Sequence, residues 1–403
     1  MRRRLWLTIL ALMVPVVLLA VLGGYFALVR ARYDAVVAAY VAAGEPMSEA
    51  ALGWPELADD DNAAVQLVRL AQAPTMPSVE AMNAALNRPA LRWDAFNIHS
   101  GLVSQLGVLR QLAWQLTDDA RQAAVFQDPE RFVVRVEQVH RLGERVSTHT
   151  PLVGFLVGLA MQDLAAQLVL EHDLILGGEA VGRLQDLFTE DPERQRQRIV
   201  EMSRAERLYA HLDLTRPLAP GSGLSGWLDR QLMLRDGPLL LTLADALRDS
   251  LLAERPADAD TLVADFQQQR FLHAGHATVS AIPGAFLASY RRLQTHQRLA
   301  LALLAVRQYQ QRHGRLPDGL DELIADARPG VLSLSALTDP FDPDARPLRY
   351  NPQTGLLYSV GLDRADGGGR IVPEAVADGT SDPWAAPDRG VRLFPEADAA
   401  AGR

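Results

Sequence analysis

Apolar side chains fill almost every position near the start of the chain. An uncharged run covers residues 5–29, with three arginines before it and two after it. As an α-helix rising about 1.5 Å per residue, this run would be roughly 37 Å long, enough for a hydrocarbon core of about 30 Å. A cleaved signal peptide has a shorter apolar region and a small-residue cleavage site. Residues 1–32 are therefore predicted to be a transmembrane signal anchor that contacts the lipid bilayer through residues 5–29.

The arginines on either side of the apolar run bear on which end of the chain lies in the cytoplasm. A very short N-terminal flank that carries arginine at residues 2–4 favours a cytoplasmic N-terminus, because positive charge is retained on that side. A single pass then places everything after Ala31 outside the cytoplasm, so we expect a protein of the bacterial cytoplasmic (inner) membrane with an extracytoplasmic bulk. The alternative is an anchor whose body faces the cytosol, since Arg30 and Arg32 lie on the other flank.

The next segment, residues 33–296, repeats apolar positions three or four residues apart, the spacing of one face of an α-helix. Asp128 and Asp191 are each followed by Pro-Glu-Arg, which places a capping carboxylate before proline at the first helical position. Asn62, after three aspartates, predicts a third helix start. A helical ectodomain of roughly eight to eleven helices is the expected result.

Shorter features of this segment predict one buried helix and two interruptions. The apolar run 152–161 is too short to cross a bilayer and is predicted to be a core helix. Residues 217–226, rich in Gly, Pro and Ser, predict a loop. The pair Gly237-Pro238 predicts a break in a later helix.

The pattern changes near the C-terminus. Residues 346–350 and 356–360 read as strands on either side of a turn with Asn, Pro and Gly, which predicts an antiparallel hairpin, and residues 391–394 read as a third strand. The expected fold class is mainly α, with a small α+β module at residues 297–395 that holds a short antiparallel sheet. Residues 396–403 offer little to bury and are expected to be a disordered tail.

Composition removes several function classes. The chain has no cysteine, which excludes disulfides, thiol nucleophiles and thiolate metal sites. All 40 basic residues are arginine, which excludes the P-loop lysine, Schiff-base lysines and Ser-Lys pairs. A net charge of -9 with scattered basic residues also argues against a nucleic-acid surface.

The C-terminal module has a distinctive order of turn residues, aromatic residues and carboxylates. After a helix-period run that ends at Gly314 come Asp339-Pro340-Phe341, Arg349-Tyr350, Ser359-Val360-Gly361-Leu362-Asp363 and Asp366-Gly367-Gly368. This order resembles the C-terminal module of the major (G-type) pseudopilin of type II secretion systems. The chain also resembles, through the phrase that begins at Asn62, poorly characterised bacterial envelope proteins in which an anchored helical ectodomain carries such a tail.

The resemblance implies a metal site. The glycine-containing loop of the major pseudopilins wraps a calcium ion with aspartates and backbone carbonyls, which suits an ion that takes six to eight oxygen ligands. Carried over to this chain, it implies that Asp363, Asp366 and Asp388 bind calcium. Arg364 stands where the family has glycine, and turn chemistry without a metal is the alternative.

One departure concerns assembly. Pseudopilins carry a peptidase-cleaved glycine before the apolar helix and a glutamate at the fifth mature position. Here Gly23 and Gly24 follow the apolar run, and Val29 occupies that fifth position. We therefore do not expect the chain to be processed or built into a pseudopilus in the usual way.

Histidines supply the competing interpretation. His273 and His276 lie three residues apart on a predicted helix, and His172 lies between Glu171 and Asp173. An envelope hydrolase would use His172, or the His273/His276 pair, with nearby carboxylates. The favoured interpretation is a non-catalytic, membrane-anchored extracytoplasmic protein that acts through contacts with an envelope protein partner, with the pseudopilin-like tail as a docking or stabilising unit.

Overall fold

The computed structural model describes most of the chain. The described residues are 2–54, 56–93, 102–189, 191–217, 221–253, 255–269, 281–371 and 388–393. Of these, residues 2–19, 102 and 103 are described as backbone alone. The expected tail at residues 396–403 lies outside this set, and so do His273 and His276.

The protein is mainly helical with one small antiparallel sheet, as the sequence predicted. The α-helices of the described residues are α1 (Arg2–Ala42), α2 (Ala63–Ala71), α3 (Val79–Leu86), α4 (Leu102–Val125), α5 (Pro129–Val146), α6 (Leu152–His172), α7 (Gly178–Phe188), α8 (Pro192–Thr215), α9 (Gly223–Leu251), α10 (Pro256–Gln267), α11 (Ile282–His313) and α12 (Leu320–Asp326). The strands are β1 (Arg349–Asn351), β2 (Leu356–Ser359) and β3 (Arg389–Arg392).

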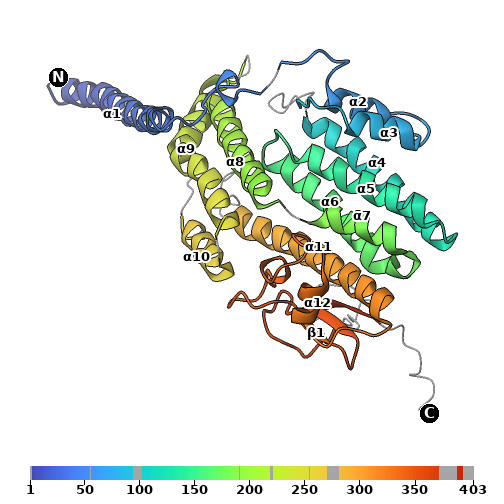
Figure 1. The fold of residues 1–403 in the computed structure, drawn as a ribbon. Coiled ribbons are helices and arrows are strands. Elements are labelled where there is room, and N and C mark those ends of the chain that lie inside the picture. Colours follow the sequence, from blue (N-terminus) through green and yellow to red (C-terminus); the bar gives the residue numbers. More distant parts are fainter. Residues whose placement is uncertain are drawn as a thin grey trace, which may run out of the picture.

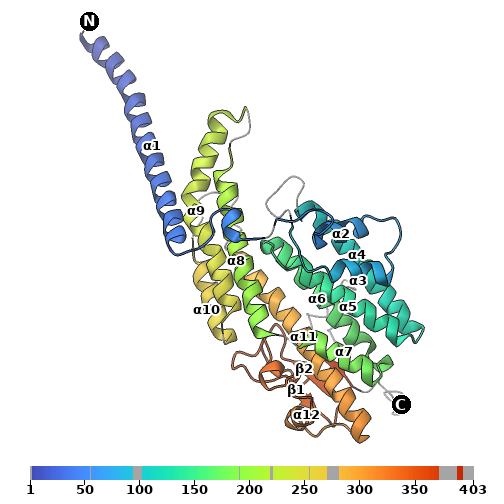
Figure 2. The same cartoon turned by 45° about the horizontal axis from the view of Figure 1, so that its top comes forward.

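The two halves of helix α1 differ in their packing against the rest of the molecule. Its N-terminal half projects away from the rest of the molecule, and its C-terminal half lies against α9 (Figures 1 and 2). Phe26, Val29 and Tyr33 are buried on the docked side. The helical part of the predicted anchor is therefore present, and its position in a membrane stays a prediction.

The predicted helix starts are confirmed. The Asp128 carboxylate accepts the backbone N–H of Arg131 at 3.1 Å, and Asp191 caps α8 in the same way. The Asn62 side chain accepts the N–H of Ala64 at 3.0 Å at the start of α2. These starts were predictable because a cap and its donors lie within three residues of each other.

The prediction of a helix break at Gly237-Pro238 is wrong. Helix α9 continues through Pro238, and Leu234 and Leu241 are buried on either side of it. Burial of these neighbours outweighs the hydrogen bond that proline removes. Gly237 has another role, because a Cβ atom there would lie 2.6 Å from the Tyr33 ring, so its absence lets α1 approach α9.

One helical stretch from Ala20 onward, Leu152–Ile175, is long and apolar enough to cross a membrane. It comprises α6 and a short 3-10 turn, and 61% of its most apolar window is buried inside the protein. Phe155, Leu159 and Met161 are among its buried residues. This burial confirms the prediction of a core helix over residues 152–161.

The expected module boundary at residues 296 and 297 falls inside α11, a continuous helix that begins fifteen residues earlier, at Ile282. In Figures 1 and 2, α11 lies between the α6–α7 side of the bundle and the C-terminal sheet. A single apolar core joins Leu142 of α5, Leu168 of α6 and Leu303 of α11 to Leu357 of β2. The C-terminal region therefore packs against the preceding helices and shares their core.

The sheet has the order β1-β2-β3, and both pairs are antiparallel. Tyr350 of β1 pairs with Leu357 of β2, which confirms the predicted hairpin. Leu357 also pairs with Val391 of β3. The third strand begins two residues before the predicted range, since Arg389 and Gly390 also pair with β2.

Candidate functional site

The three aspartates predicted to bind calcium follow β2 or precede β3. Asp363 and Asp366 lie in the turn after β2, and Asp388 directly precedes β3. The turn adopts left-handed backbone angles at Gly361, Arg364, Gly368 and Gly369. We call residues 361–370 together with Asp388 the glycine loop.

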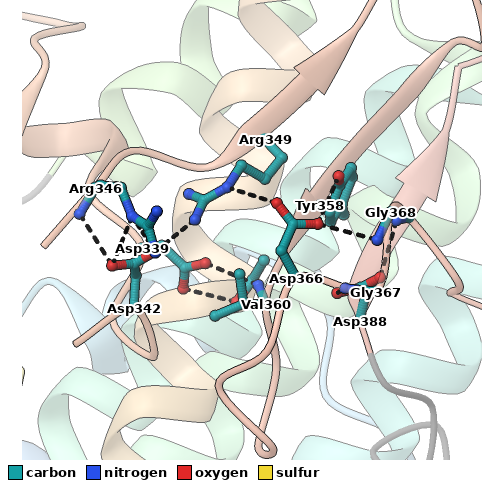
Figure 3. Close-up of polar contacts among 12 residues, drawn as sticks. Asp339, Asp342, Arg346, Arg349, Tyr358, Val360, Asp366, Gly367, Gly368 and Asp388 are labelled. Atoms are coloured by element: carbon teal, nitrogen blue, oxygen red, sulfur yellow. Dashed lines mark hydrogen bonds and ion pairs between the residues drawn. The ribbon is translucent and has the colours of Figure 1, made fainter. Parts of the chain in front are cut away.

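Asp388 is the centre of the glycine loop (Figure 3). Its buried carboxylate accepts backbone N–H groups from Gly367 at 3.0 Å, Gly369 at 2.9 Å and Arg370 at 2.8 Å. Such charge-assisted bonds are stronger than neutral ones, and together they compensate for the burial of the carboxylate. A Cβ atom at residue 369 would lie 2.7 Å from the Leu356 side chain, so only glycine fits there without a shift.

Asp366 takes part in a second set of bonds. Its carboxylate accepts the Gly368 N–H at 3.0 Å, the Tyr358 hydroxyl at 3.1 Å and the Arg349 Nε–H at 3.3 Å. The Gly368 N–H, with Tyr358 and Arg349, lowers the pKa of Asp366 below its usual value. Burial and the bond to Asp366 raise the pKa of Tyr358 to about 12. Arg349 extends this set to the buried carboxylate of Asp342 (Figure 3).

Asp363 does not join these carboxylates through a bond. It is exposed and accepts the Ala365 N–H at 3.0 Å within its own turn. The next residue, Arg364, donates to the Asp260 carboxylate of α10 at 2.5 and 2.9 Å. The residue that departs from the pseudopilin pattern therefore ties the glycine loop to the ectodomain.

The hydrogen-bond donors of the glycine loop bear on whether it could bind calcium. Calcium requires oxygens that point inward, whereas here backbone N–H groups point at both carboxylate oxygens of Asp388. The described residues contain no group of three or more His, Asp or Glu side chains that could hold a metal ion. In this arrangement the backbone N–H groups use both oxygens of Asp388 to close the turn, and calcium binding by Asp363, Asp366 and Asp388 stays a prediction.

Of the three histidines in the hydrolase hypothesis, His172 is the one that lies within the described residues. Its ring packs edge-on against Phe132 at a centroid distance of 6.0 Å. The neighbouring carboxylates bind arginines: Glu171 accepts from Arg121 at 3.4 Å, and Asp173 accepts from Arg307 at 2.6 Å. The Glu171 carboxylate also lies 3.9 Å from His172 Nε2, so the structure brings these two side chains together while Arg121 contacts the same carboxylate.

A polar cavity was missed by sequence reasoning. It measures about 380 Å³, lies among α5, α6, α7, α8 and α11, and is lined by His140, Glu144 and Arg198. Burial lowers the pKa of His140 to about 4, so its imidazole is neutral near neutral pH. Its Nδ1 atom has no hydrogen-bond partner within the described chain. The signal was present, because His140 lies four residues after Val136, on the apolar face of the predicted helix.

A second site that sequence reasoning missed joins α1 to the body. The fully buried Arg207 of α8 donates to Glu45 at 2.7 Å and to Asp245 of α9 at 2.5 Å, and its guanidinium lies 4.5 Å from the centroid of the Tyr40 ring. Tyr40 donates to Asp245 at 2.6 Å. Burial and this bond raise the pKa of Tyr40 to about 12. We call these four residues the anchor junction.

Close to the anchor junction, Tyr33 packs against Gly237. Its hydroxyl shares a hydrogen bond of 2.8 Å with His211 Nδ1 on α8. Burial raises the pKa of Tyr33 and lowers that of His211. The second half of α1 is thus held by apolar packing, one neutral hydrogen bond and one charged cluster.

Comparisons with known proteins add no relative: no family model matches the chain, and neither does any curated protein or solved structure. Arguments about function therefore rest on the geometry above and on the resemblance drawn from the C-terminal residues.

Proposed function

We propose that this chain is a single-pass, membrane-anchored protein of the bacterial envelope whose bulk lies outside the cytoplasm. The observation that carries the proposal is the division of α1. One continuous helix has an N-terminal half that projects from the body and a C-terminal half that packs one face against α9. An apolar helix of this length that leaves the body supports a membrane anchor with a fixed connection to an ectodomain.

The anchor junction supports the same proposal. It holds α1 by side chains from three separate segments: Glu45 after α1, Arg207 of α8 and Asp245 of α9. A buried charge that lost its partner would be costly, so α1 is kept in one orientation relative to α8 and α9. The ectodomain would then sit at a set distance and angle from the bilayer.

The function proposed for the ectodomain is non-catalytic binding of another envelope protein. The C-terminal sheet provides a surface for it, because β1 is an edge strand whose residues line a hollow of about 550 Å³. Leu334, 55% exposed, and Tyr350 contribute apolar surface to that hollow, and Arg346 contributes charge. The edge of the described sheet, beside a hollow with both apolar and polar lining, suits recognition of a protein segment.

A topology reporter tests the anchor. An enzyme that folds only outside the cytoplasm, fused after Arg403, should be active, and a fluorescent protein that folds only inside should be dark. The matched control replaces the arginines of residues 2–4 by glutamate, which should weaken the preference for a cytoplasmic N-terminus. Activity of the inside reporter on the unaltered chain would contradict the proposal.

Crosslinking tests the partner surface. A photoreactive amino acid at Leu334 in living cells should give a discrete product of higher mass. The same group at Val125, which is 74% exposed at the C-terminal end of α4, serves as the control. Equal products from both positions, or none from Leu334, would count against a partner on this surface.

A further inference from the structure

Exposed apolar side chains gather where α1 meets the start of α9. Eight of the seventeen large apolar side chains exposed within the described chain belong to two short segments, residues 21–28 and 224–232. The eight are Val21, Leu22, Tyr25, Leu28, Leu224, Trp227, Leu228 and Leu232. We call this surface the apolar collar. Its concentration on two short segments distinguishes it from singly scattered apolar residues, which are normal on a protein surface.

The two segments lie side by side at a defined level. The rings of Phe26 and Trp227 meet edge-on with centroids 5.0 Å apart. Farther along, Tyr33 meets Gly237, and then Tyr40 bonds Asp245, so α1 and α9 run in the same direction. Figure 2 shows α9 alongside the C-terminal part of α1. Helix α9 therefore begins at the level of the last third of the predicted span, near Phe26.

The exposed residues of α9 form one stripe. Leu224, Trp227 and Leu228 are spaced by three and four residues, and Leu232 follows four residues later, so all of them lie on one helix face. At a rise of about 1.5 Å per residue, Leu224 lies about 4.5 Å farther along α1, toward its N-terminus, than Trp227. The start of the stripe therefore lies beside the part of the predicted span that precedes Phe26.

Two arginines of α9, Arg230 and Arg235, lie near this stripe. Arg235 lies with its guanidinium 5.7 Å from the centroid of the Tyr25 ring. Arg230 donates to the Leu214 carbonyl at 2.6 Å. An apolar helix face that carries an indole and has arginines close by is typical of a helix in the headgroup region of a membrane.

We propose that the first turns of α9 dip into the headgroup and acyl boundary of the bilayer that α1 crosses, as a second membrane contact of the ectodomain. The inference rests on the proposed membrane anchor. The occupant of the apolar collar is lipid, because the stripe of α9 is continuous with the exposed apolar side of α1 through the Phe26–Trp227 contact. Burial of about 5–10 Å, typical of interfacial helices, would cover Leu224, Trp227 and Leu228.

The absence of cysteine makes a direct test simple, since any single cysteine introduced into the chain is a unique label. Leu224→Cys, Leu22→Cys and Trp114→Cys are prepared in the full chain, spin-labelled and reconstituted in vesicles of phosphatidylethanolamine and phosphatidylglycerol. Collision rates with oxygen, which enters lipid, are compared with those of a polar nickel chelate, which stays in water. All three native side chains are exposed, and circular dichroism checks the fold of each variant.

The expected result is an oxygen-to-nickel ratio at residues 22 and 224 that exceeds that at residue 114 several-fold. If residue 22 reports lipid and residue 224 reports water, the second contact is overturned and the anchor is retained. If residue 22 also reports water, the anchor proposal fails, and this inference fails with it. Dipolar broadening at residue 224 in dilute vesicles would show a second copy of the chain in place of lipid, and would also overturn the inference.

Discussion

The anchor junction and the glycine loop both bury a charged side chain, and they stabilise it by different means. In the anchor junction, the buried Arg207 is paired with carboxylates from two other segments, Glu45 and Asp245. In the glycine loop, the buried Asp388 is surrounded by three backbone N–H groups from residues 367–370. The first arrangement depends on how helices are docked, and the second depends on one turn.

This difference predicts how far a disturbance spreads. Loss of the Arg207 side chain removes the buried cation shared by segments that are far apart in the sequence, and leaves their carboxylates only the more exposed Arg204 and Arg248, so the docking of α1 on α8 and α9 should loosen. Loss of the Asp388 charge leaves backbone N–H groups of a single turn without an acceptor, so the effect should stay close to the sheet.

The largest effect is expected at Arg207. Arg207→Met in the full chain should lower the free energy of unfolding by about 3 kcal/mol, because Glu45 and Asp245 lose the buried cation between them and keep only the more exposed Arg204 and Arg248. Urea unfolding in detergent, followed by circular dichroism, measures this change. Arg204→Met is the matched control on the same helix, since Arg204 also contacts Glu45, at 3.3 Å, but from a half-exposed position. The control should cost less than about 1 kcal/mol, and equal losses would contradict the comparison.

His140 is a buried side chain whose Nδ1 has no hydrogen-bond partner among the described residues; the Glu144 carboxylate lies 4.0 Å away. Its pKa is lowered from 6.5 to about 4, so the unfolded chain binds a proton in this interval that the folded chain does not bind. Stability should therefore fall as pH drops from about 6.5 to 4, by roughly 3 kcal/mol from this residue. His140→Gln should remove that part of the pH dependence.

The control for the pH experiment is His313→Gln. His313 is a largely exposed histidine that contacts Asp326 at 2.9 Å. Urea unfolding at a series of pH values should give parallel profiles for the control and the unaltered chain, and a flatter profile for His140→Gln. A parallel profile for His140→Gln would show that the imidazole is protonated inside the fold.

At the glycine loop, Asp388→Asn should cost about 1–3 kcal/mol, because an amide has one oxygen to offer three N–H groups. Amide hydrogen exchange should accelerate at residues 367–370 and stay unchanged in α1. Asp363→Asn is the control, with an expected change within about 0.5 kcal/mol. Faster exchange throughout α1 in the Asp388 variant would break the distinction between the two regions.

The smallest effect is expected from calcium. The pseudopilin resemblance implies a rise in the thermal midpoint, whereas the N–H groups around Asp388 predict equal midpoints in calcium and in a chelator. The full chain is the proper sample, because its C-terminal region shares a core with the helices. A rise that disappears in Asp363→Ala would place a metal on the loop after all.

Sequence reasoning succeeded where the deciding residues are neighbours. The caps at Asp128 and Asp191 and the hairpin around β1 and β2 depend on residues a few positions apart, and all were predicted. The anchor junction and His140 were missed because their surroundings come from segments that meet only after folding. The boundary at residue 297 was misplaced for the same reason, since the burial of α11 depends on helices more than a hundred residues earlier.

The central position of α11 has a consequence for biogenesis. If the body is exported as proposed, the N-terminal helices emerge first, yet the core they share with α11 cannot close until a segment that begins at Ile282 has also crossed the membrane. Until then, the inner faces of α4, α5 and α6 would be open to solvent. Intermediates with exposed apolar surface aggregate readily. The protein should therefore depend on holding chaperones at the outer face of the membrane until translocation is complete.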